Sequence, residues 1–84
     1  MDFLPFDPTR RKFDEPTHAL LLQLADEFGT VDLREMAESA EWCVRIVTVE
    51  KETKERLPLA ALGETPFAAA ERLIRICGLR HPDK

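Results

Sequence analysis

Residues 42 to 50 read Trp-Cys-Val-Arg-Ile-Val-Thr-Val-Glu, and this stretch decides the fold. Its valines, isoleucine and threonine are β-branched, and such side chains pack well on a pleated sheet, so the stretch predicts a strand. Alternation along a strand sorts the side chains into two faces. The face that we expect to meet the core carries Trp42, Val44, Ile46 and Thr48. The other face, which we expect to be at most partly covered, carries Cys43, Arg45, Val47 and Val49.

Length and composition predict one small globular domain. The chain has 84 residues, enough for a single core. Its 44% hydrophobic and 33% charged residues are typical of globular proteins and exclude a disordered chain. Residues 19–22 form the longest aliphatic run, which is too short to cross a bilayer, and the first residues lack the basic start of a signal peptide. We therefore expect a cytoplasmic protein with no membrane partner.

Residues 1–16 are expected to form an extended arm. Three prolines in this segment bar a continuous helix. The segment also holds Phe3, Phe6 and Phe13, and each phenylalanine gains about 1.5–3 kcal/mol when its side chain is fully covered. The arm is therefore expected to pack either on its own domain or on a partner.

Residues 17–79 are expected to form a compact α+β domain with the element order α-α-β-β-α, followed by a frayed tail at 80–84. The predicted sheet is antiparallel, has two or three strands and is packed by the helices. An apolar stripe that includes Leu20 and Leu24 predicts the first helix, up to Gly29. Thr65 and Pro66 are typical of a helix start and predict the last helix.

Residues 30–40 fit two structures. The spacing of Leu33, Met36, Ala37 and Ala40 predicts a short helix over residues 32–40. The alternation of Val31 with Leu33 leaves a strand at residues 30–36 as the alternative. Further along, residues 56–62 predict a second strand, and Pro58 confines that strand to a sheet edge.

Residues 21–38 resemble the first two helices of a winged-helix domain. Such a domain needs a recognition helix next, rich in basic or amide side chains. The chain instead has the strand-like residues 42–49, so DNA binding by this route is not expected.

No motif indicates catalysis, a metal or a cofactor. The soft ligands are His18, Cys43, Cys77 and His81, and none of them falls at a zinc-binding spacing. The single serine, Ser39, lies among glutamates that would not activate it as a nucleophile. The three glycines are too isolated to form a phosphate loop. We therefore expect that the protein is not an enzyme.

The leading hypothesis is a small acidic protein-binding module that acts by stoichiometric association. Accessory or inhibitory proteins, including those encoded by mobile elements, are of this kind. The expected contact residues are Phe3, Phe6, Phe13, Cys43, Val47 and Val49. Because apolar side chains exceed what one small core can cover, a homodimer is also expected.

The alternative hypothesis is nucleic-acid binding by a set of basic residues. The formal net charge of −4 argues against it, since such proteins usually carry a basic excess. A steep dependence of affinity on salt would distinguish phosphate contacts from apolar ones. The basic residues in question are Arg10, Arg11, Lys12, Arg72, Arg75 and Arg80.

Overall fold

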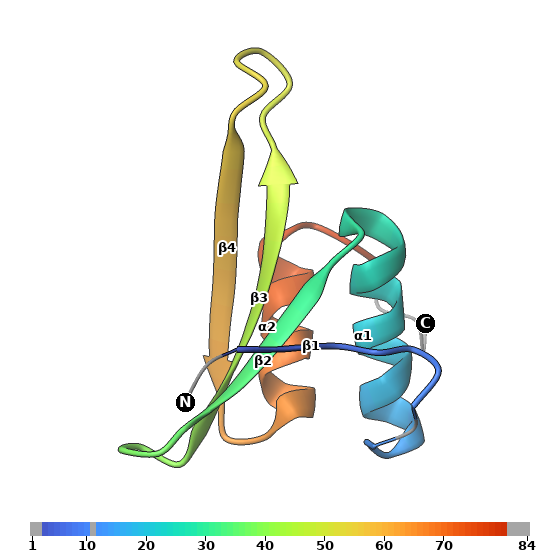
Figure 1. The fold of residues 1–84 in the computed structure, drawn as a ribbon, viewed down its shortest axis with the longest axis vertical. Helices are drawn as coiled ribbons and strands as arrows, with labels where there is room; N and C mark the ends of the chain where they lie inside the picture. Colours follow the sequence, from blue (N-terminus) through green and yellow to red (C-terminus); the bar gives the residue numbers. More distant parts are fainter. Residues whose placement is uncertain (1–2, 11, 81–84) are drawn as a thin grey trace.

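The computed structural model describes residues 3–10 and 12–80 (Figure 1). The elements in chain order are β1 (Leu4–Pro5), α1 (Glu15–Phe28), β2 (Val31–Met36), β3 (Glu41–Val49), β4 (Arg56–Gly63) and α2 (Pro66–Ile76). The strands form one antiparallel sheet in the order β1-β2-β3-β4. Within the described residues, no helix is long and apolar enough to cross a membrane. The expected tail at 80–84 lies outside them except for Arg80.

The structure is a small α+β domain, but the predicted order α-α-β-β-α and the two- or three-stranded sheet are wrong. Residues 31–36 form a strand of a four-stranded sheet, so the predicted helix over 32–40 is wrong and the alternative of a strand at 30–36 is confirmed. Val31 and Leu33 are buried and lie opposite Ile46 and Val44 of β3. A helix there would leave this edge of β3 unpaired, so pairing outweighs the helical spacing. The resemblance to a winged-helix domain fails for the same reason.

The prediction of a strand around residues 42–50 is confirmed by β3, which lies between β2 and β4. Val44 and Ile46 are fully buried, as the alternation predicted. Trp42 and Thr48 are only half-buried near the ends of the strand. The edge position of the strand that contains Pro58 is also confirmed.

Both helices pack on one side of the sheet, which we call the covered face. The core joins Val44, Ile46 and Ala61 of the sheet to leucines of α1 and to apolar residues of α2. Thr65 caps α2, because its hydroxyl oxygen accepts a hydrogen bond from the Ala68 amide at 3.1 Å. The approach of α2 to β4 is close: a methyl group added to Gly63 would lie 2.5 Å from the amide nitrogen of Ala69.

The hairpin of β3 and β4 projects beyond the helices (Figure 1). Its turn is closed by a hydrogen bond from the amide of Glu50 to the carbonyl of Glu55, at 2.9 Å. Near this turn the side chains of Val49 and Leu57 are 53% and 40% exposed. They lie on opposite faces, so this end of the hairpin is uncovered on both sides.

Candidate functional site: the open face of the sheet

The side of the sheet away from the helices, which we call the open face, carries a continuous group of apolar side chains. The strand register places Cys43 opposite Leu62, and Val47 opposite Pro58. Leu62 is 41% exposed and Val49 is 53% exposed, whereas Cys43 is buried. We call this group the apolar strip, and it consists of Cys43, Val47, Val49, Pro58, Ala60 and Leu62.

An arginine cluster adjoins the apolar strip, with Arg45 between Cys43 and Val47 on β3. Nη2 of Arg45 lies 3.0 Å from Oδ2 of Asp32. The guanidinium of Arg45 stacks over the ring of Phe3 at 4.1 Å, and the guanidinium of Arg34 lies 5.9 Å from that ring. Phe3 is therefore held on the open face by cation–π contacts.

The border of the apolar strip has a positive excess. Arg34 and Arg56 form no ion pair within the described part of the chain. The register puts both on the open face with Arg45, against the carboxylates of Asp32 and Glu41. Three positive charges and two negative ones leave this face at +1, although the whole chain carries −4. The open face is thus electrostatically distinct from the rest of the protein.

The structure separates the six contact residues expected from the sequence. Phe3, Cys43, Val47 and Val49 share the open face. The other two phenylalanines lie on the helix side and pack against the core. The Phe6 ring lies 5.4 Å from the His18 ring, and the Phe13 ring meets Trp42 edge-on at 6.4 Å.

Sequence reasoning missed three members of the apolar strip, namely Pro58, Ala60 and Leu62. The signal that could have found them is the alternation of side chains in residues 56–62. Once these residues pair with β3, every second one lies on the open face. It also missed Arg34, because a helix was expected there. Arg34 joins the open face only when residues 31–36 pair as a strand.

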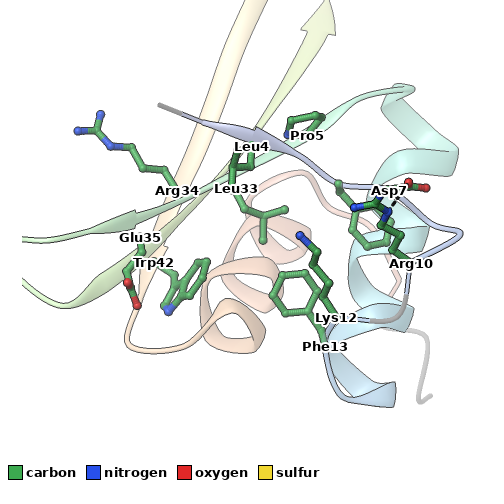
Figure 2. Close-up of a pocket in the computed structure, with 11 residues that line it drawn as sticks. Leu4, Pro5, Asp7, Arg10, Lys12, Phe13, Leu33, Arg34, Glu35 and Trp42 are labelled. Atoms are coloured by element: carbon green, nitrogen blue, oxygen red, sulfur yellow. Dashed lines mark ion pairs between the residues drawn. The ribbon is translucent and has the colours of Figure 1, made fainter. Parts of the chain in front are cut away.

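A cavity of about 560 Å³ lies between the arm and the edge of the sheet (Figure 2). The arm pairs with β2 at Leu4, turns at residues 7–10 and returns to α1. The Thr9 hydroxyl and amide both donate hydrogen bonds to the Asp7 carboxylate. These hydrogen bonds lower the pKa of Asp7, and the positive charges of Arg10 and Lys12 lower it further by a smaller amount. The cavity is lined by Leu4, Pro5, Phe6, Asp7, Arg10, Lys12, Phe13, Leu33, Arg34, Glu35 and Trp42.

The two cysteines are free thiols with little nucleophilic character. Burial raises the pKa of the Cys43 thiol, although Arg45 and Arg34 oppose the effect, and burial also raises the pKa of the Cys77 thiol. Both therefore stay protonated at neutral pH, and the thiolate is the reactive form. Among the described residues, no three His, Cys, Asp or Glu side chains gather as a metal site.

The basic residues of the alternative hypothesis lie on different elements. Arg10 and Lys12 belong to the arm, and Nε of Arg10 lies 3.8 Å from Oδ2 of Asp7. Arg72 and Arg75 belong to α2, where Nη2 of Arg75 lies 3.6 Å from Oε1 of Glu71. The backbone carbonyl of Arg80 accepts a hydrogen bond from the Gln23 side chain. Arg11 lies outside the described residues.

The open face therefore offers apolar contact and guanidinium groups. These groups can bind another surface. Comparisons of the chain with protein families, with curated proteins and with solved structures found no match.

Proposed function

We propose that this chain is a protein-binding module that acts by stoichiometric association, with the open face as its contact surface. The observation that carries the proposal is the placement of both helices on one side of the sheet, which leaves all of the apolar strip except Cys43 in contact with water. The solvated face of an antiparallel sheet is ordinarily polar. Contiguous exposed apolar groups mark interaction sites.

The charges on the open face favour a partner surface that has an apolar centre and an acidic border. Arg34 and Arg56 lack carboxylate partners within the described residues and border the strip on β2 and β4. Arginine is enriched at protein interfaces, where complementary charges fix the register of two surfaces. A second copy of this chain would bring the same positive excess, so a different protein fits the face better than a homodimer does.

The test uses pairs of exposed residues with matched exposure. Leu62 and Val49 on the open face are 41% and 53% exposed, and Leu22 and Ile76 on the helices are 44% and 56% exposed. We would compare the double variant V49E/L62E with the control L22E/I76E. Each tagged protein would capture partners from a lysate of the source organism, and light scattering would give the mass of each protein alone.

The open-face variant should lose proteins that the wild type and the control both retain. Equal capture by both variants would contradict the proposal. A wild-type mass of twice 9.6 kDa that V49E/L62E alone abolishes would show that the partner is a second copy. Loss of capture after nuclease treatment, with a steep salt dependence, would favour nucleic-acid binding instead.

A further inference from the structure

The cavity between the arm and the sheet edge is separate from the apolar strip and has the features of a small-molecule site. We propose that it binds a small apolar monocarboxylic acid, with the alkyl or aryl body among the aromatic rings and the carboxylate at Lys12. Its volume of about 560 Å³ falls within the roughly 300–1,000 Å³ of ligand pockets.

The apolar side chains that line the cavity favour an apolar alkyl or aryl group as the main part of the ligand. Leu33 of β2 is buried and points into the cavity (Figure 2). Phe13 of the arm and Trp42 of β3 lie on the same side of the sheet, in edge-to-face contact at 6.4 Å. These three side chains come from segments far apart in sequence and present apolar surface to one space. Covering such surface with an apolar ligand is favourable because it removes that surface from water.

The charged side chains that line the cavity favour an anionic head group on the ligand. Lys12 points into the cavity toward Leu33 (Figure 2), and it forms no ion pair within the described residues. The other cation there, Arg10, is paired with Asp7. Lysine is a compact point charge that binds an anionic group without a fixed geometry. Among the described residues, Lys12 is thus the cation that faces the cavity without an ion pair, and one carboxylate on the ligand matches it.

The remaining charged lining residues do not compete for this head group. Figure 2 shows Arg34 pointing away from the cavity, and its guanidinium lies near Phe3 on the open face. Trp42 lies between Glu35 and Lys12 in the same view. A negative charge at Glu35 disfavours a second anionic group at that end, so a monocarboxylate fits better than a dicarboxylate.

The chain carries its own reporter for this site. Trp42 is the single tryptophan, and the chain has no tyrosine, so intrinsic fluorescence reports on the cavity wall. Wild-type protein would be titrated with octanoate, with 1-octanol and with octylamine, which share an eight-carbon chain and differ in charge. We expect a saturable change in emission with octanoate, weaker binding of octanol and the weakest binding of octylamine.

Two lysine variants test the role assigned to Lys12. K12M keeps the apolar stem and removes the charge, and K51M does the same at an exposed lysine in the distant hairpin turn. K12M should weaken octanoate binding about tenfold, the usual size of one charge-assisted contact, and leave octanol binding unchanged. K51M should bind both ligands like the wild type.

Three results would overturn this inference: no saturable change with octanoate, equal binding of octanoate and octanol, or equal losses in K12M and K51M. The V49E/L62E variant should still bind octanoate normally, because its changes lie on the hairpin and the open face. The proposal of a ligand site can therefore be tested independently of the proposed protein-binding function.

Discussion

The two faces of the sheet differ in how far their side chains are buried. On the covered face, Ile46 is 1% exposed and packs against both helices, and on the open face its chain neighbour Val47 lies half-buried beside Pro58. Because side chains alternate along a strand, the nine residues of β3 supply four side chains to the covered face and five to the open face. Residues one position apart are therefore expected to respond very differently to substitution.

The largest expected effect is the loss of a core side chain from the covered face. I46A should lower the free energy of unfolding by about 2–5 kcal/mol, because it leaves a cavity among buried residues. V47A, on the same strand, should cost less than about 1 kcal/mol, within the range of strand preferences. Urea unfolding followed by circular dichroism measures both. Equal losses would mean that the two faces do not differ as described.

The second effect tests how closely α2 approaches β4. G63A would place a methyl group 2.5 Å from the Ala69 nitrogen and 2.8 Å from the Ala68 carbonyl carbon, which are backbone atoms that a rotamer change cannot move. Overpacking of this kind costs about 1–3 kcal/mol. The control L62A removes atoms from the preceding residue, whose side chain lies on the open face, and should have a smaller effect. Thermal melting that is unchanged in G63A would refute the close contact.

A third, smaller effect concerns the polar contacts of the open face. R45M removes the ion pair with Asp32 and the stacking over Phe3, at a cost of about 1 kcal/mol, because the pair is partly exposed to solvent. R34M has only the longer contact with Phe3 to lose. The difference between the two variants should shrink at high salt, where exposed charges are screened. A larger loss in R34M would contradict this assignment.

The smallest expected effect on stability concerns Asp7 of the arm, which runs from Phe3 on the open face to Phe13 on the covered face. Hydrogen bonds from Thr9 lower the pKa of Asp7 from its ordinary value of 3.8. A depressed folded-state pKa contributes stability above the unfolded pKa, and this contribution is lost as the pH falls through the folded pKa. D7N should therefore melt slightly below the wild type at neutral pH and converge with it in acid. A gap that widens in acid would contradict the sign.

The sequence predicted β3, the edge position of Pro58 and the cap at Thr65 because each depends on local side-chain properties. It could not decide between a helix and the strand β2, because Leu33 fits a helical spacing with Met36 and Ala37 and also alternates with Val31. Pairing with Val44 and Ile46 decides between the two, and this contact forms between residues more than ten positions apart. Because residues 32–40 were predicted to be a helix, the predicted sheet lacked β2 and the predicted element order was wrong.

The candidate site was found only in part for a related reason. Val47 and Val49 follow from the alternation in β3, but their neighbours on the open face depend on the register with β4. The cavity could not be predicted at all, since it depends on where the arm crosses Leu33 and on the orientation of Lys12. The sequence shows Phe6 and Phe13 to be large apolar residues of the arm, but no local pattern fixed the side of the sheet on which they pack.

The pairing of β1 with β2 also has a consequence for the order in which the molecule assembles. Leu4 lies opposite Leu33, so the first strand of the chain docks on one that is synthesised nearly thirty residues later. β2 gains its own neighbour only when β3 has emerged. A contact between distant segments must await closure of the intervening loop. The arm is thus expected to dock only after β2 and β3 have paired, so the cavity is completed after this part of the sheet exists.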